Sequence, residues 1–333
     1  MKGNRNTLRL RQCSDTVYMK IVHGIENYKV RGPAAVTIGK FDGIHSGHAL
    51  LTEKIRTCNG MTSVMVTFET SPRSVLFEPG LKKLITDQER NAYLKKKGID
   101  VLLILPFDDD MIHMSPRDFI EMLVTKLKMK YLVVGDDFTF GYQGKGNVKT
   151  LESLSASLGF HLEAIDKLSR DGLVISSTAI RGMIENGQIQ KANEFLGHPY
   201  FIYGPVIHGN HIGTQMGVPT INLSPPEDKL LPPNGVYVTK VDIEGRIYHG
   251  ITDVGFKPTI EVPTDHVVVE THLLDYSANL YEKYATVIFL SYVREEKKFD
   301  SIEELTAQIR RDTKAARAFF ESENESLATK EKL

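Results

Sequence analysis

Short apolar runs recur through the first part of the chain, and each has the length and the β-branched composition of a buried strand. They occupy residues 34–39, 63–68, 101–105 and 131–134. Segments with helical patterning lie between them. Because strand and helix alternate, this part is predicted to be a Rossmann-like α/β layer: a parallel sheet with helices on both faces.

Two of these helices carry start and stop signals. Thr86 and Glu89 have the spacing of a capping box, and Gly98 is a typical helix stop. Ser115 followed by Pro116 marks a second start, because proline suits the first helical position.

The pattern changes after Gly187. A helix is expected at residues 188–196, and strands at 201–207, 235–243, 247–254, 267–274 and 284–292, separated by turn residues. Close strand spacing predicts a mostly antiparallel β-barrel. Ser301 and Glu304 have capping-box spacing at the start of a C-terminal helix. Its predicted packed face consists of Ile302, Leu305, Ile309, Ala316 and Phe320. Two domains are therefore expected, residues 1–187 and 188–333.

Composition narrows the class of protein. The 333 residues contain 41 Lys and Arg against 42 Asp and Glu, which gives a net charge of -1. This balance provides no electrostatic reason to expect a nucleic-acid partner or an anionic membrane. The two cysteines, Cys13 and Cys58, lack metal-ligand spacing, which argues against a disulfide scaffold or a zinc ribbon.

The N-terminal residues and the lack of long apolar runs also narrow the class of protein. Residues 1–15 are basic and polar without an apolar core, so no secretory signal is expected. No stretch has the roughly 18 uncharged apolar residues of a membrane span. We expect a reduced, cytoplasmic, globular protein with small-molecule substrates; self-association is left open.

The most informative motif follows the first strand. Residues 39–48 read GKFDGIHSGH. Glycines let the backbone approach a ligand closely, and a helix N-terminus near His48 would attract phosphate. His45 and His48, three residues apart, could donate hydrogen bonds to phosphate oxygens. A lone histidine there would be an ordinary capping or surface residue, but the combined pattern favours a phosphate site.

This segment resembles the H-x-G-H signature of nucleotidyltransferases, and in its fuller form the adenylyltransferase module of bacterial bifunctional riboflavin kinase/FAD synthetases. Residues 134–141 (VGDDFTFG) are similar to the flavin-side block of that family, and residues 175–181 (ISSTAIR) to its second nucleotide block. The resemblance implies adenylyl transfer from ATP to FMN, with His45, His48 and Arg181 as catalytic residues. It implies nucleotide or flavin binding by Gly39, Phe41, Asp42, Gly43, Asp137, Phe138, Ser177 and Thr178.

The second half carries two further blocks. Residues 204–222 contain a glycine series, Gly209, Gly213 and Gly217, followed by Pro-Thr-Ile-Asn. This block resembles the G-x-P-T-A-N block of riboflavin kinase, which implies that the three glycines bind nucleotide and that Thr220 and Asn222 bind Mg²⁺ together with the ATP phosphates. Taken alone, these are common turn residues.

Residues 269–275 (VETHLLD) place a carboxylate inside an otherwise apolar strand. The block resembles one of the kinase family, which implies that Glu270 is the catalytic base that deprotonates riboflavin for phosphorylation to FMN. Residues 293–312 also resemble the end of the kinase pattern. A generic cytidylyltransferase would explain the first half of the chain but not this second half.

Four positions depart from the family pattern: Thr70 and Ser71 after the second strand, Thr214 in the glycine-rich loop and Glu282 before the last strand. They leave two alternatives open. One is a single-activity enzyme with one degenerate module, and the other is a flavin-binding regulator without turnover. Intact H-x-G-H and S-S-T-x-I-R blocks, and the intact Thr220, Asn222 and Glu270, favour the bifunctional enzyme.

Overall fold

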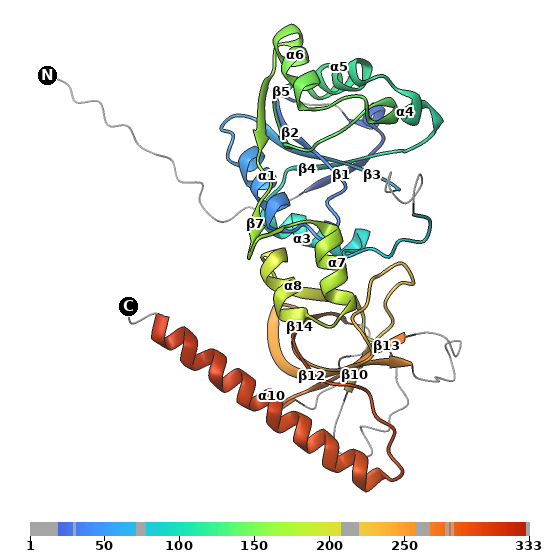
Figure 1. Cartoon of the computed structure of the whole chain (residues 1–333), viewed down its shortest axis with the longest axis vertical. Helices are drawn as coiled ribbons and strands as arrows, with labels where there is room; N and C mark the ends of the chain where they lie inside the picture. Colours follow the sequence, from blue (N-terminus) through green and yellow to red (C-terminus); the bar gives the residue numbers. More distant parts are fainter. Residues whose placement is uncertain are drawn as a thin grey trace, which may run out of the picture.

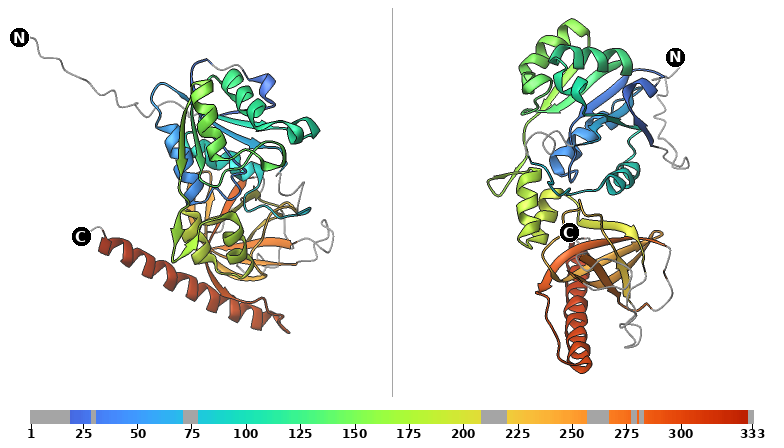
Figure 2. Two further views of the ribbon diagram at one scale, coloured as in Figure 1. Left: turned by 45° about the horizontal axis from the view of Figure 1, so that its top comes forward. Right: turned by 90° about the vertical axis from the view of Figure 1, so that its right-hand side faces the viewer.

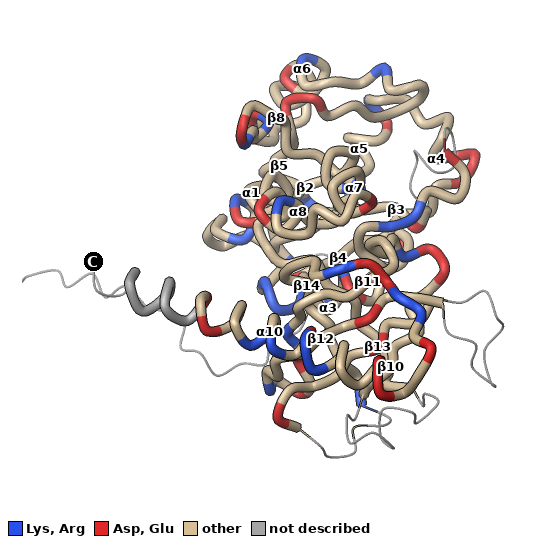
Figure 3. The backbone as a smooth tube through the Cα atoms, turned by 60° about the horizontal axis from the view of Figure 1, so that its bottom comes forward, with Lys and Arg blue, Asp and Glu red and all other residues tan. Residues whose placement is uncertain are grey.

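The computed structural model describes residues 19–28, 31–70, 78–207, 220–256, 267–276, 280 and 283–330, with side chains up to residue 323. Two regions follow one another along the longest axis of the molecule (Figure 1). An α/β region contains the first part of the chain, and a β-rich region with a long C-terminal helix contains the last part. Basic and acidic positions are interspersed over the described part of the backbone (Figure 3), in keeping with the near-zero net charge.

The first region is built on six parallel strands, of which the four central ones are largely buried, whereas the edge strands β1 and β6 are mostly exposed or half-buried. A short antiparallel pair, β7 (Ser169–Arg170) and β8 (Leu173–Val174), follows them. The six strands are β1 (Lys20–His23), β2 (Ala34–Ile38), β3 (Thr62–Phe68), β4 (Val101–Leu105), β5 (Met129–Gly135) and β6 (His161–Ile165).

These strands are ordered β1-β4-β3-β2-β5-β6. Leu123 and Leu151, from α5 (Pro116–Leu127) and α6 (Val148–Leu158), pack on one face of the sheet. Ile55 and Leu94, from α1 (Ser46–Arg56) and α3 (Asp87–Lys97), pack on the other face. The predicted parallel sheet with helices on both faces is confirmed.

The two predicted helix starts are also confirmed. Thr86 caps α3 in a complete capping box with Glu89, and Gly98 ends the helix in the left-handed conformation. The Ser115 hydroxyl accepts a hydrogen bond from the backbone N–H of Asp118 at the start of α5. The shorter helical elements are η1 (Ile25–Asn27), α4 (Asp109–His113) and η2 (Tyr142–Gly144).

The second region is the predicted antiparallel barrel. Its strands are ordered β10-β13-β12-β11-β14-β9. A bridge between Ile207 and Asn222, whose backbone N–H and carbonyl lie 2.8 Å apart, joins the two edges and curls the sheet. The strands are β9 (Tyr200–Pro205), β10 (Thr220–Leu223), β11 (Gly235–Ile243), β12 (Arg246–Phe256), β13 (Val267–Leu273) and β14 (Tyr284–Arg294).

Two helices, α7 (Ser177–Glu185) and α8 (Ile189–Leu196), lie between the sheet and the barrel (Figures 1 and 2). Ile184 and Phe195 from these helices share one apolar cluster with barrel residues such as Tyr237 and Phe289. The polypeptide therefore starts to pack on the barrel before residue 187, while the division of the domains at residues 187 and 188 stays a prediction.

The C-terminal helix α10 (Ile302–Lys330) packs beside the barrel. Its residues Ala316 and Phe320 are buried, as predicted. Ile302 is 63% exposed, so the prediction that it lies on the packed face was wrong. Ile302 is the first residue of the helix and lies beyond the edge of the barrel core. Arg294 of β14 holds the helix through ion-paired hydrogen bonds to Asp312 of 2.7–3.1 Å. None of the described helices is long and apolar enough to cross a membrane.

Candidate active sites

The first candidate site lies at the carboxyl ends of β2 and β5. From β2 the sheet continues to β3 and β4, whereas β5 lies on its other side, so the strand order reverses between β2 and β5. Crevices at such a reversal are where open α/β sheets bind ligands. The segment after β2 holds residues 39–48, and the segment after β5 holds Asp137 and Phe138.

The turn after β2 has an unusual backbone. Phe41 and Ile44 have positive φ angles of 51° and 45°, and Gly43 between them has 85°. Left-handed backbone is rare for non-glycine residues and marks positions held by their surroundings. Both side chains are buried. A Cβ on Gly39 would lie 3.2 Å from the Phe41 ring, so the glycine lets this ring fold back over the strand end.

His45 and His48 lie where this turn enters α1. Their rings stack with centroids 3.7 Å apart, and Phe41 meets the His48 ring edge-on at 5.2 Å. His45 is the N-cap residue, yet its side chain caps no amide, unlike the N-cap side chains of α3, α5 and α7. Within the part of the chain that the structure describes, Nδ1 of each histidine is buried without a hydrogen-bond partner.

Burial keeps both rings neutral. The pKa of His45 is lowered to about 4, chiefly by loss of water and in addition by His198, while Asp137 opposes the shift. The pKa of His48 is lowered well below its usual value by complete burial and by the neighbouring His45. A neutral imidazole donates one hydrogen bond, so the pair offers N–H groups, with little charge, beside a helix start.

Asp42 connects distant parts of the chain behind this turn. Its carboxylate accepts hydrogen bonds from the backbone N–H of Leu84 at 2.8 Å and from the Arg181 guanidinium at 2.7 Å. Its backbone carbonyl accepts a hydrogen bond of 2.8 Å from the Ser177 hydroxyl at the start of α7. The two predicted nucleotide blocks, more than 130 residues apart in sequence, are thus in direct contact.

A cavity of about 640 Å³ opens beside Asp42. Its wall includes the predicted residues Phe41, Asp42, Ser177, Thr178 and Arg181, together with cationic side chains that sequence analysis did not single out. The guanidinium of Arg181 also donates to the Lys82 carbonyl. The additional basic residues in the wall are Lys40, Lys82, Lys83 and Arg90, and they are balanced by the acidic residues Asp42, Glu69, Asp87, Glu227 and Asp228.

The predicted flavin-side residues follow β5 and are not among the residues that line the cavity of about 640 Å³. Asp137 is exposed and forms an ion pair of 2.8 Å with Lys167. Phe138 is half-buried, with its ring stacked on Phe140 at 5.4 Å. Asp137 is close enough to raise the pKa of His45, which places it on the histidine side of the crevice.

The second candidate site is a row of polar side chains on one sheet face. Asn222 of β10 lies directly opposite Glu270 of β13, and the Thr220 hydroxyl donates a hydrogen bond of 2.7 Å to the Glu270 carboxylate. Residues opposite one another in an antiparallel pair share a face. The structure therefore brings together all three predicted residues, with Asn222 buried.

Sequence analysis missed Asp253. It lies opposite Glu270 on the other neighbouring strand, β12, so the row runs Asn222, Glu270, Asp253. The signal was present, since Asp253, like Glu270, is a carboxylate within an apolar strand. Gly209, Gly213, Gly217, Thr214, Ser71 and Glu282 lie outside the described residues.

An α/β layer with two histidines at a helix start, beside a cavity lined by polar and charged residues, defines a nucleotide-transferring domain. The barrel that follows, with a carboxylate among neutral oxygen ligands, defines a phosphoryl-transferring one. Comparison with known proteins agrees with both assignments. The FAD synthetase family matches residues 28–179, and the riboflavin kinase family matches residues 196–320.

Relatives match over nearly the whole chain. The bifunctional riboflavin kinase/FMN adenylyltransferase of Haemophilus influenzae is 36% identical over 91% of this chain and 100% of its own length. That of Bacillus subtilis is 34% identical over 86% and 92%. A crystal structure described as a macrolide-efflux protein from Streptococcus pneumoniae superimposes with a TM-score of 0.79, at 28% identity over 90% of this chain and 98% of that one.

The chain belongs to the family of bifunctional riboflavin kinase/FMN adenylyltransferases. It is a transferase with an N-terminal FMN adenylyltransferase domain and a C-terminal riboflavin kinase domain, as its motifs predicted. The alternatives of a single degenerate activity and of a regulator without turnover are not favoured.

Proposed function

We propose that the crevice at residues 39–48 transfers the adenylyl group of ATP to FMN, and that the polar row around Glu270 phosphorylates riboflavin. One observation carries both assignments. In each region, residues from blocks far apart in sequence meet: Ser177 and Arg181 at Asp42, and Thr220 at Glu270.

Adenylyl transfer needs no protein nucleophile. An FMN phosphate oxygen attacks the α-phosphorus of ATP, a new P–O bond forms, and the bond to pyrophosphate breaks. The protein has to align the two phosphates and offset the charge that develops on the leaving group. His45 and His48 donate N–H groups for this purpose beside the amides of the α1 N-terminus, and Arg181 contributes positive charge.

The remaining predicted residues bind the substrates of this reaction. Gly39, Phe41, Asp42 and Gly43 shape the nucleotide turn. Ser177 and Thr178, at the start of α7, contribute hydroxyl groups at the cavity wall. Asp137 and Phe138, in the segment after β5, contact the flavin nucleotide.

In the second reaction, Glu270 takes the proton from the ribityl 5′-hydroxyl as its oxygen attacks the γ-phosphorus of ATP, and ADP leaves. The hydrogen bond from Thr220 fixes the position of one Glu270 oxygen and so holds the carboxylate beside Thr220 and Asn222. Gly209, Gly213 and Gly217 belong to the loop that we assign to the nucleotide.

Mg²⁺ fits the donors of this row. The Asn222 amide oxygen and the Thr220 hydroxyl oxygen are hard, neutral ligands, and the Thr220 oxygen keeps lone pairs while its hydrogen points to Glu270. We propose that Thr220 and Asn222 hold Mg²⁺ jointly with ATP, where the ion would offset phosphate charge. We further place the enzyme in the cytoplasm, with small molecules and no nucleic acid as its partners.

Incubation of the full chain with riboflavin and Mg-ATP, followed by chromatography, tests the proposal. FMN should appear first and FAD later, and supplied FMN with ATP should give FAD directly. FMN without FAD would assign only the kinase. FAD only from supplied FMN would assign only the transferase, and neither product would indicate a flavin-binding protein without turnover.

A further inference from the structure

The turn that carries the histidine pair is held from outside its own region. Three of its residues, Phe41, Gly43 and Ile44, have left-handed backbone. For the two non-glycine residues, Phe41 and Ile44, such a conformation persists only where neighbouring groups fix it. Asp42 supplies part of this support through its hydrogen bonds to Leu84 and Arg181, as described above.

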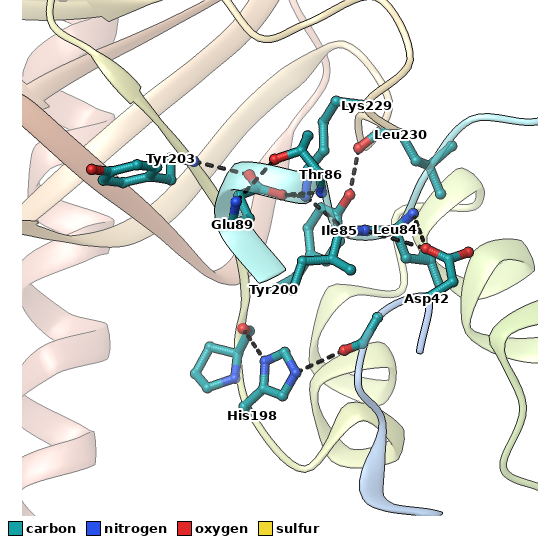
Figure 4. A network of polar contacts seen from close by, with 12 residues as sticks. Asp42, Leu84, Ile85, Thr86, Glu89, His198, Tyr200, Tyr203, Lys229 and Leu230 are labelled. Carbon is teal, nitrogen blue, oxygen red and sulfur yellow. Dashed lines mark hydrogen bonds and ion pairs between the residues drawn. The ribbon is translucent and has the colours of Figure 1, made fainter. Parts of the chain in front are cut away.

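A second support comes from the barrel side of the molecule. Nε2 of His198, in the loop between α8 and β9, lies 3.0 Å from the carbonyl oxygen of Gly43 (Figure 4). Gly43 is the middle of the three left-handed residues. A hydrogen bond at its carbonyl therefore fixes the peptide plane on which the path toward His45 depends.

The His198 ring is itself held in place. Its Nδ1 lies 2.9 Å from the carbonyl oxygen of Pro199, a contact within its own loop. Tyr93 of α3 packs on the ring at 4.8 Å between centroids, and Phe201 lies at 6.0 Å. Both ring nitrogens thus face carbonyl oxygens. Burial lowers the pKa of His198, so the ring is neutral and donates one hydrogen bond; we assign its N–H to Nε2, where it bonds Gly43 and joins the two regions.

The same loop also contacts the start of α1. The Ser46 hydroxyl donates a hydrogen bond of 3.1 Å to the carbonyl oxygen of Phe195. Gly197 has a positive φ of 75°, and a Cβ there would lie 2.6 Å from the Ser46 hydroxyl oxygen. Residues 195–198 therefore contact the chain on both sides of His45, at Gly43 and at Ser46.

A buried ion pair fixes this interface nearby. Lys229 of the barrel region donates to the Glu89 carboxylate at 2.7 Å and to the Leu84 carbonyl at 2.8 Å, and both groups are almost completely buried (Figure 4). Glu89 also accepts the backbone N–H of Tyr203 at 3.0 Å. Leu84 in turn donates its N–H to Asp42. The Lys229–Glu89 pair therefore supports the turn indirectly, through Leu84 and Asp42.

We infer that His198 is a positioning residue for adenylyl transfer: its hydrogen bond to Gly43 holds the histidine pair in line with the nucleotide, although His198 belongs to the region that carries the kinase site. Adenylyl transfer thus depends on a side chain beyond the adenylyltransferase crevice, whereas riboflavin phosphorylation does not use this contact. The inference rests on the proposed adenylyl transfer at residues 39–48.

The test compares two substitutions in the full chain. His198→Leu keeps an apolar side chain against Tyr93 but removes the hydrogen bond. His198→Gln places an amide nitrogen the same number of bonds from Cα as Nε2 of histidine, so it can restore the donor. Lys96→Gln is the matched control, because it breaks a cross-region ion pair with Asp242, 3.5 Å long, that does not touch the turn.

Steady-state rates for FMN adenylylation and for riboflavin phosphorylation are measured on each preparation. We expect His198→Leu to lower kcat for adenylylation about tenfold, the scale of one hydrogen bond, with a smaller change in the KM for ATP. Riboflavin phosphorylation should stay within about twofold of wild type in every variant. His198→Gln should recover most of the adenylylation, and Lys96→Gln should match wild type in both reactions.

Three results would overturn the inference: unchanged adenylylation in His198→Leu, an equal loss of both activities, or a loss in His198→Gln as large as in His198→Leu. If His198→Leu does not fold, the Gln variant decides, through its kcat and KM for adenylylation relative to Lys96→Gln. Failure of the wild-type chain to convert FMN to FAD is a different outcome, since it would contradict the proposed function itself.

Discussion

The two active sites handle the same nucleotide with different chemistry. The proposed adenylyltransferase site is built at a helix N-terminus, from a stacked histidine pair beside a cavity whose wall carries both basic and acidic side chains. In the proposed kinase site, the row of Asn222, Glu270 and Asp253 consists of oxygen-bearing side chains, and Thr220 donates a hydrogen bond to Glu270. In the proposed mechanism, the first site offsets phosphate charge with imidazole N–H groups and Arg181, whereas in the second site a metal ion bound together with ATP would do so.

The two sites also differ in how their geometry is fixed. Thr220, Asn222 and Glu270 lie in the register of two paired strands, where backbone hydrogen bonds set their spacing. His45 and His48 follow a strained turn that depends on Asp42 and His198. Changes remote from the site should consequently affect adenylylation more than phosphorylation.

The largest separation of the two activities is expected from Glu270→Gln. The substitution keeps size and hydrogen-bonding reach but removes the basic oxygen, and a general base contributes about 10²–10⁴-fold. Riboflavin phosphorylation should fall by that factor while FMN adenylylation continues. Turnover of each half-reaction in one purified sample, with folding checked by circular dichroism, measures this.

Asp275→Asn is the matched control for Glu270→Gln, because Asp275 lies in the same sequence block but forms an exposed ion pair with Arg317. It should leave both activities unchanged. Normal phosphorylation in a folded Glu270→Gln protein would show that Glu270 is an ordinary strand residue.

The reverse separation is expected from His48→Ala. Loss of one preorganised donor to a developing anion costs about 10²–10³-fold in other enzymes, so FAD formation should fall by this amount and FMN formation should be spared. His161→Ala is a control from the same region, since His161 is exposed and its ring stacks on Tyr131, outside the proposed site. Equal loss of both activities in His48→Ala would indicate a structural role.

A smaller effect is expected from Asn222→Ala. Removing one neutral ligand should raise the KM for Mg-ATP in riboflavin phosphorylation about tenfold, with adenylylation unaffected. Calorimetry of the wild-type chain with Mg²⁺ alone should show weak binding that strengthens with a nonhydrolysable ATP analogue. Tight binding of Mg²⁺ without nucleotide would contradict a site made of Thr220 and Asn222.

Sequence patterns predicted the fold where local signals were strong. The runs at β2, β3, β4 and β5 and the capping box at Thr86 match the structure closely. Five strands were missed: β1 and β6 at the sheet edges, the short pair β7 and β8, and β10. The edge strands β1 and β6 are incompletely buried, so their sequences show no clear apolar run. Strand β10 has only four residues and follows a glycine-rich segment, so it shows none either.

Sequence patterns predicted the motifs of the adenylyltransferase site but not the hydrogen bonds that join them. Nothing in residues 39–48 indicates that Asp42 binds Leu84 and Arg181, because these contacts depend on how distant segments pack. The roles of His198 and of the Lys229–Glu89 pair were likewise invisible, since each joins residues from different regions. A buried lysine gives no local signal in sequence, as its partner lies 140 positions away.

The smallest expected effect concerns pH and stability at the histidine pair. Burial holds the pKa of His45 near 4 in the folded chain, against 6.5 for an unperturbed histidine. Between these values the unfolded chain binds more protons, so the free energy of unfolding should fall as pH drops from about 6.5 toward 4, and be insensitive to this group above that range. At pH 5.5 the loss amounts to about 1 kcal/mol for His45.

His45→Asn removes this titration and gives the test. Denaturant unfolding of wild type and variant at pH 7.5 and pH 5.5 should show a loss of stability between the two pH values that is about 1 kcal/mol smaller in the variant. In the wild type, addition of an ATP analogue should make the loss of stability between pH 7.5 and pH 5.5 smaller. Phosphate near the His45 ring favours its protonated form and so raises its pKa. The kinase region, whose described row contains no such buried histidine, should unfold with the same pH dependence in both proteins. An identical pH dependence in wild type and variant would show that His45 is solvated, and would remove the contrast between a dry histidine pair and a strand-borne carboxylate.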